Sequence, residues 1–238
     1  MFPIIFKPKK KFKLIRLGKE ADGGYLVGKD SVKNSSFLLS FGISNDWSFE
    51  RDFIKSKKVN FLCFDDHISV KFFLKRIFYK IVFFPFIKEK KSLFKEILKF
   101  IDFLNFFDST SLKIKKISYG SLEEILTEIN FKNIFLKVDI EGYEYRILDE
   151  ILEYQDYFSG CIIEFHNVDL HELRISNFIK KFDLELVHIH GNNFSQNYNN
   201  NPIVLELTFD KYPLVESKLN ILPNPLDRPS NPSKKESV

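Results

Sequence analysis

Alanine and cysteine are scarce in this chain, and long apolar runs are absent. Ala21 is the only alanine, and Cys63 and Cys161 are the only cysteines among the 238 residues. Both cysteines fall inside predicted strands, so we expect two buried, reduced thiols rather than a disulfide. No run reaches the roughly 18 apolar residues that a membrane-spanning helix needs, and the apolar stretch at the N-terminus is too short for a signal peptide. We therefore expect a cytoplasmic protein without stable membrane insertion.

Charge is unevenly distributed along the chain. The formal net charge is +4, and residues 70–100 hold nine Lys or Arg residues against two Glu, whereas 139–170 is mostly acidic. A basic stretch can indicate a nucleic-acid site or an anionic membrane surface. Aromatic residues are plentiful throughout the chain, with 28 phenylalanines, so those near the basic stretch do not mark platforms for stacked bases. We interpret the stretch as a helical cover with a solvated basic face and expect no nucleic-acid partner.

Strands and helices are predicted to alternate along most of the chain. Apolar runs bounded by turn residues predict strands at 37–42, 59–64, 114–117, 134–138, 161–165, 184–189 and 203–209. Helices are predicted at about 48–57, 69–83 and 91–106, from a Ser121–Glu124 capping box onward, and at 145–154 and 171–181. This order predicts an α/β fold with a doubly wound, mostly parallel sheet. The last two strands have no long helix between them, so we expect them to form an antiparallel edge hairpin.

The predicted domain organisation is simple. We expect one domain over residues 1–229, with a basic helical insert at about 69–106. Residues 230–238 are mostly polar, contain Pro232 and directly follow Pro229, so we expect a disordered tail.

The segment from Ile134 to Tyr154 predicts a strand, a turn and a helix. Asp139 follows the strand directly, at the carboxyl edge where open α/β sheets bind their ligands. Gly142 allows a sharp turn, and Glu141 and Glu144 at the predicted helix start are favourable against its dipole. The alternative is an ordinary turn with two capping acids.

A second candidate site follows the strand at 37–42. The turn through Gly42, with Ser44 and Asp46, offers backbone N–H groups to an anionic ligand. Asp65 and Asp66 follow the next strand, 23 and 24 residues after Gly42, close to the spacing of ribose-binding acids in dinucleotide folds. The alternatives are a plain strand–helix turn and solvated loop acids.

Two further polar pairs occur near strand ends. Glu164 and His166 share one face of their strand and are expected to converge with Asp139, where the three can bind a divalent metal or hold a general base. His188 and His190 precede a compact turn of glycine and two asparagines, and His190 is a further candidate metal ligand. The alternatives are a hydrogen-bonded structural histidine at 166 and a polar turn without function after His190.

Together these segments resemble the FkbM-like S-adenosylmethionine-dependent methyltransferases. Residues 136–144 are similar to the LKxDxEGxE segment typical of that family. Further similarities are found at residues 22–25, 41–50, 164–166 and 190–193, and the resemblance spans about residues 15–228. One departure is Ser44, which stands where family members often have a second glycine.

The resemblance implies a fold, a cofactor and a reaction. It implies a seven-stranded, Rossmann-like class I methyltransferase sheet. Gly42, Ser44 and Asp46 would lie along the methionine part of S-adenosylmethionine, and Asp65 or Asp66 at its ribose. The implied activity is O-methylation of a hydroxyl on a sugar, a surface-polysaccharide precursor or a similar small molecule.

The chemical roles left open by the resemblance concern the acceptor side of the site. Asp139 or His166 is the expected general base, and Glu164 orients the imidazole or shares a divalent metal. The alternatives are a metal-dependent nucleotide-sugar enzyme and a non-catalytic protein that retains the fold.

Overall fold

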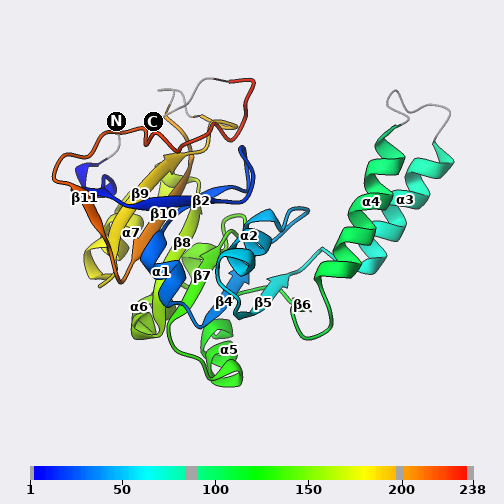
Figure 1. The fold of residues 1–238 in the computed structure, drawn as a ribbon, viewed down its shortest axis with the longest axis horizontal. Helices are drawn as coiled ribbons and strands as arrows, with labels where there is room; N and C mark the ends of the chain where they lie inside the picture. The colour runs from blue at the N-terminus through cyan, green and yellow to red at the C-terminus, as the bar shows by residue number, and fades with distance from the viewer. Residues whose placement is uncertain (1–2, 84–90, 197–200, 235–238) are drawn as a thin grey trace.

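A seven-stranded sheet forms the centre of the protein (Figure 1). The structure, a computed structural model, describes residues 3–83, 91–196 and 201–234. The strand order is β6-β5-β4-β7-β8-β10-β9, and β10 is antiparallel to both neighbours whereas the other pairs are parallel. The strands are β4 Phe37–Phe41, β5 Asn60–Asp65, β6 Leu112–Ile114, β7 Ile134–Val138, β8 Phe158–His166, β9 Glu185–Gly191 and β10 Val204–Asp210. The predicted mostly parallel α/β sheet with an antiparallel edge hairpin is confirmed.

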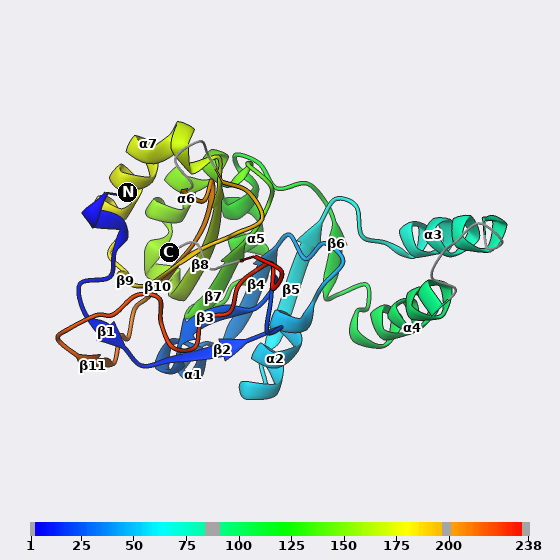
Figure 2. The ribbon, with the colours of Figure 1, turned by 90° about the horizontal axis from the view of Figure 1, so that it is seen from above.

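Helices cover both faces of this sheet (Figure 2). The first core cluster joins one face to helices α5 Ser121–Ile129, α6 Leu148–Glu153 and α7 Val168–Lys181. The second joins the other face to α1 Lys29–Asn34, α2 Ser48–Ser56 and the hairpin of β2 Leu14–Leu17 and β3 Tyr25–Gly28. Neighbouring residues of β7 point to opposite clusters, Leu136 to the first and Phe135 to the second. Strands buried on both faces need such continuous apolar runs, which is why the sequence pattern located them.

Short elements complete the described chain. A two-stranded sheet pairs β1 Lys11–Phe12 with β11 Val215–Ser217. Three short 3₁₀ helices are η1 Ile4–Phe6, η3 Glu144–Arg146 and η4 Gln155–Tyr157. The predicted continuous helix at 145–154 is wrong, because its start is η3 and only Leu148–Glu153 is α-helical. The Tyr145 hydroxyl donates to the His166 carbonyl, so contacts with β8 hold this segment rather than a helical hydrogen-bond ladder.

The start of α5 is capped by a different residue than predicted. Gly120 is the N-cap, and Ser121 lies inside the helix without capping it. The carboxylate of Glu150, on α6, instead accepts hydrogen bonds from the backbone N–H groups of Gly120 (2.7 Å) and Leu122 (2.9 Å). The predicted capping box is therefore wrong, since a carboxylate from a neighbouring helix satisfies these N–H groups.

The insert forms a helical hairpin that projects away from the sheet (Figures 1 and 2). It comprises α3 Val70–Val82 and α4 Lys91–Phe106, and its base joins a small core through Phe73 and Phe103, which contact Trp47. The two predicted helices are confirmed, but the prediction that they cover the body of the protein is wrong. Apolar contacts anchor only the base of the hairpin, beside the edge strand β6.

The C-terminal segment contacts the turn after β9. The side chain of Asn193 exchanges hydrogen bonds with the backbone of Asn231, and the Lys234 ammonium donates to the carbonyl of Phe194. Residues 230–234 therefore differ from the disordered tail expected from the sequence, and 235–238 lie outside the described residues. Among the described residues, no helix is long and apolar enough to span a membrane.

Candidate functional site

The sheet changes winding direction between β4 and β7, and the candidate site lies there. Ligands of open α/β sheets bind at the carboxyl ends of the strands beside such a switch point. Gly42 follows β4 with a φ of 77°, and a Cβ atom on it would lie 1.6 Å from the carbonyl oxygen of Asp139, which follows β7. Glycine at 42 is therefore required by the close approach of these two strand ends.

Two adjoining cavities open at this edge. The smaller one has a volume of about 300 Å³ and the larger about 740 Å³. Ser44, Asn45, Asp139 and Glu141 line both, whereas Glu164 and His166 line only the larger. Asp139 therefore lies at the junction of two spaces, one beside the Gly42 turn and the other beside β8.

The structure separates the two candidate ribose-binding acids. Both carboxylate oxygens of Asp65 accept backbone N–H groups, Oδ2 from Ile43 and Ser44 and Oδ1 from His67 and Ile68. Asp65 thus holds the turn together. Asp66 lines the smaller cavity with a partly exposed carboxylate, whose described contact is with the His67 ring at 3.3 Å. Asp66 is therefore the acid available to a ligand.

The other residues expected at the cofactor lie in the same turn. Ser44 has a φ of 45°, in the left-handed region that favours glycine. Asp46 lines the larger cavity, accepts a hydrogen bond from the Ser48 N–H group and pairs with the Lys19 ammonium at 2.6 Å. The Asn45 side-chain oxygen is buried and has no hydrogen-bond partner among the described residues. This oxygen can accept from a ligand bound where the two cavities meet.

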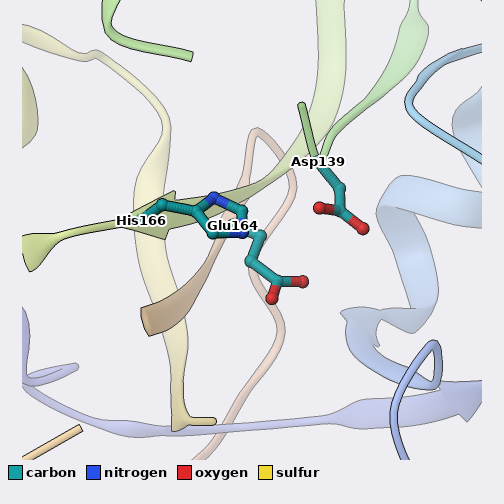
Figure 3. A group of neighbouring side chains, drawn as sticks. All are labelled: Asp139, Glu164 and His166. Atoms are coloured by element: carbon teal, nitrogen blue, oxygen red, sulfur yellow. The ribbon is translucent and has the colours of Figure 1, made fainter. Parts of the chain in front are cut away.

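Asp139, Glu164 and His166 converge as the sequence predicts (Figure 3). Strands β7 and β8 are adjacent and parallel, so the residues at their carboxyl ends come together. One ligand atom from each of the three side chains lies within 4.8 Å of the others. Two carboxylates and one imidazole form a donor set suited to a divalent cation or to proton transfer.

Two neighbours outside β7 and β8 order the carboxylates. The Tyr25 hydroxyl, from β3, lies 3.2 Å from Asp139 Oδ2 and 3.1 Å from Glu164 Oε2. The amide of Asn192 approaches the second oxygen of Glu164 at 3.4 Å. The hairpin β2–β3 and the turn after β9 therefore form part of the site.

Glu144 orients the imidazole of His166. Its Oε1 accepts the His166 backbone N–H at 2.7 Å and lies 3.3 Å from the ring Nδ1, while its Oε2 accepts the N–H of Gly142 at 2.8 Å. A carboxylate beside Nδ1 fixes the orientation of the ring, and the other ring nitrogen, Nε2, lies 3.4 Å from the exposed carboxylate of Glu141. Glu144 is fully buried and acts on the site through His166 rather than as a capping acid.

Burial sets the proton affinities of the three converging groups. Burial raises the pKa of Glu164 to about 8, helped by the nearby charge of Asp139. Burial also raises the pKa of Asp139, although Lys137 and His166 oppose this. Burial would lower the pKa of His166, but hydrogen bonding to Glu144 and the surrounding carboxylates raise it to about 9. Raised carboxyl pKa values show that the site favours additional positive charge.

A buried ion pair lies directly beneath the site. The Lys137 ammonium donates to the carbonyl oxygen of Gly42 at 2.9 Å and pairs with Glu50 at 3.2 Å. Burial alone would lower the pKa of Lys137, but Glu50 and Asp139 outweigh it and raise the pKa. Lys137 therefore ties the Gly42 turn to α2 and places a fixed positive charge near Asp139.

His190, the fourth candidate metal ligand, does not join the cluster among the described residues. Glu206 of β10 is the register partner of both Glu164 and His190. Because β10 lies between β8 and β9, the backbones of Glu164 and His190 are two strand spacings apart, roughly 10 Å. His190 instead approaches Asp227 at 3.6 Å, and burial lowers its pKa to about 4. Among the described residues, His190 therefore does not lie with the other three predicted metal ligands.

Sequence reasoning assigned no role to several residues of this site. Lys137 could have been noticed as a charge inside an apolar strand, since a buried ammonium needs a partner. Tyr25 and Asn192 lie in segments that contribute to the family resemblance, but nothing local indicates their contact with Glu164. Their role depends on which strands lie beside β8.

The chain was compared with protein-family models and with curated proteins, and it matches none of them. The resemblance to FkbM-like methyltransferases therefore depends on the motifs quoted above.

Proposed function

We propose that this protein is an S-adenosylmethionine-dependent O-methyltransferase whose acceptor is a hydroxyl of a sugar, a polysaccharide precursor or a similar small molecule. The observation that best supports this proposal is the pair of cavities meeting at Asp139. One cavity has the features of a nucleoside site, and the other contains the Asp139–Glu164–His166 cluster. Transfer between two bound molecules needs two such spaces with a common boundary.

The smaller cavity fits the adenosine part of the cofactor. Asp66 provides a carboxylate for the ribose hydroxyls, at the end of the strand next to the Gly42 turn. Asn45 offers an unpartnered buried oxygen to the amino group of the methionine part. Gly42 and Ser44 also line this smaller cavity, and Asp46 borders the larger one.

Bound S-adenosylmethionine supplies an electrophilic methyl group. Asp139 is the proposed general base, because it alone of the three clustered residues lines both cavities. His166, held by Glu144, donates a hydrogen bond that orients the acceptor hydroxyl. The Tyr25 hydroxyl, which lies between the carboxylates of Asp139 and Glu164, restrains Asp139. The proton moves from the acceptor hydroxyl to Asp139, whose raised pKa makes it a stronger base than an exposed aspartate.

The Asp139–Glu164–His166 cluster also favours a second candidate, a metal-dependent nucleotide-sugar enzyme. The three side chains can hold a divalent cation that neutralises the buried carboxylates and binds a diphosphate. Calorimetric titration with S-adenosylmethionine and with a uridine-diphosphate sugar, each with and without Mg²⁺ or Mn²⁺, separates the candidates. Metal-independent binding of S-adenosylmethionine supports the methyltransferase, and metal-dependent binding of only the sugar nucleotide contradicts it.

The roles of the clustered residues are tested with variants once an acceptor is found. Asp139→Asn should slow methyl transfer by roughly 10²–10⁴-fold, since a general base is lost, and leave binding of S-adenosylmethionine nearly unchanged. If a metal holds the acceptor, a chelator stops turnover and Glu164→Gln reproduces that effect. Normal turnover in Asp139→Asn, Glu164→Gln and His166→Ala would contradict the proposed site. A cytoplasmic location is part of this proposal, since the two thiols are free and buried.

A further inference from the structure

The projecting helical hairpin exposes large apolar side chains. Phe78 is 68% exposed and Phe94 is 63% exposed. The other exposed apolar residues on its two helices and their ends are Val70, Leu74, Tyr79, Ile81, Val82, Phe83, Leu98, Ile101 and Leu104. A cluster of this kind on a protein surface indicates an interaction site.

These side chains form ordered faces on both helices. Leu74, Phe78 and Ile81 follow the spacing of one face of α3. Phe94, Leu98 and Ile101 follow the same spacing on α4. Neither face is needed to hold the hairpin together, because a separate set of side chains forms its interior.

The interior of the hairpin has its own contacts. Phe73 of α3 stacks on Phe100 of α4 with 5.5 Å between the ring centroids. The buried carboxylate of Glu96 pairs with Arg76 at 2.9 Å and with Lys80 at 2.8 Å. The exposed apolar faces are therefore free to contact something outside the chain.

The exposed, unpaired charges on the described part of the hairpin are positive. Lys71, Lys75, Lys91 and Lys95 are exposed, and none forms an ion pair with a described residue. The carboxylates on the described part of the hairpin, Glu96 and Asp102, are both paired, the second with Arg51 at 2.6 Å. The outward surface of the described hairpin thus combines apolar side chains with lysines and lacks an unpaired acid.

We propose that the α3–α4 hairpin docks this protein reversibly onto an anionic lipid bilayer. Amphipathic helices with lysine and large apolar residues bury the apolar face at the headgroup boundary, and each nearby lysine adds attraction to anionic lipids. The lysine side chains are long enough to reach the headgroups while their stems lie along the apolar surface. The docking is peripheral, since neither helix of the hairpin is long and apolar enough to span a bilayer.

A second copy of the chain is a poorer occupant of this surface. A twofold interface would place the same surface on both partners, so each would bring unpaired lysines and, from the described residues of the hairpin, no free carboxylate to the contact. Like charges facing each other disfavour association. An anionic bilayer instead complements the lysines.

Docking by the hairpin would set the position of the candidate site relative to the bilayer. Lys99 of α4 lines the larger cavity, and its ammonium lies 5.6 Å from the centre of the Trp47 ring. The helix that contacts the bilayer therefore also borders the larger cavity. The docking proposal itself does not depend on the proposed methyltransferase function.

Vesicle flotation with the full chain tests the proposal. We expect binding to vesicles of equal parts phosphatidylcholine and phosphatidylglycerol, and at least about tenfold weaker binding to phosphatidylcholine alone. Phe78→Ser with Phe94→Ser should weaken binding about tenfold or more, because two apolar side chains no longer enter the boundary. Lys71→Gln with Lys75→Gln should also weaken it about tenfold, and added salt should reproduce that loss.

Two matched control variants test whether weaker vesicle binding is specific to changes in the hairpin. Leu170→Ser with Leu173→Ser removes two apolar residues of α7 that are at least as exposed as Phe78 and Phe94. Lys180→Gln with Lys181→Gln removes two exposed lysines from the same helix. Both should bind vesicles as the unaltered chain does. Absence of vesicle binding, or equal loss in hairpin and control variants, overturns the proposal. So does a dimer in light scattering that becomes monomeric in the Phe78→Ser, Phe94→Ser variant while vesicles remain unbound.

Discussion

Gly42 and Ser44 both have positive φ, but they have different surroundings. Gly42→Ala would place a Cβ atom 1.6 Å from the Asp139 carbonyl oxygen, so we expect it to lower the free energy of unfolding by roughly 2 kcal/mol or more. Ser44→Gly removes a strained side chain and should change that free energy by less than about 1 kcal/mol. Urea denaturation of both variants checks this. If both variants lost the same free energy of unfolding, the close approach of the Asp139 carbonyl would not be the reason that residue 42 is glycine.

Asp65 and Asp66 are neighbours with different expected roles. Asp66→Ala should weaken S-adenosylmethionine binding by about tenfold or more, because hydrogen bonds to a charged group contribute roughly 1.5–3 kcal/mol, with little change in stability. Asp65→Ala should instead destabilise the fold, because two backbone N–H groups in the turn after β4 and two in the loop after β5 lose their acceptor. Calorimetric titration and urea denaturation measure the two effects. Tight binding by the folded Asp66→Ala variant would mean that the cofactor lies elsewhere.

At the scale of elements, helix α5 depends on a carboxylate from α6. Glu150→Ala should lower the free energy of unfolding by about 1–3 kcal/mol, because the N–H groups of Gly120 and Leu122 lose their acceptor. Glu128→Ala is the matched control, an exposed acid on α5 itself, and should change stability by less than about 0.5 kcal/mol. Thermal or urea unfolding checks both, and similar effects would contradict the capping role.

The elements differ in how far the sequence predicts them. Strands β4, β7 and β8 are continuous apolar runs, so their positions were predicted to within a few residues. The hairpin α3–α4 has helical periodicity too, and its existence was predicted. Its direction was not, because both helices have apolar residues on more than one side and the sequence does not show which side contacts the body.

At the scale of the whole molecule, we expect stability to depend on the protonation of Asp210. This carboxyl is buried, which raises its pKa to about 6. Between about pH 4 and pH 6 the native state binds more protons than the unfolded state, so stability falls as pH rises through this range. Because the pKa of Asp210 is raised by about two pH units, this carboxyl changes the free energy of unfolding by at most roughly 3 kcal/mol.

Substitution isolates this contribution. Asp210→Asn retains an acceptor for the Tyr212 N–H group. In this variant we expect stability to fall less between about pH 4 and pH 6, because the side chain no longer titrates. Asp183→Asn, at an exposed position, should follow the unaltered chain. Chemical denaturation at a series of pH values measures the difference, and parallel curves for the Asp210→Asn variant and the unaltered chain would contradict the prediction.

The sequence alone was enough to determine the alternation of strands and helices, the parallel sheet and the convergence of Asp139, Glu164 and His166. These follow from local periodicity and from the rule that parallel strands end at one edge. Only the tertiary structure decided that Asp66 rather than Asp65 is free, and that His190 lies apart from the cluster. Those outcomes depend on which distant segment lies beside each side chain. One carboxylate oxygen of Asp65 is bound by the N–H groups of Ile43 and Ser44, in the turn after β4, and β10 separates β9 from β8. Neither arrangement is visible in the residues that neighbour Asp65 or His190 in sequence.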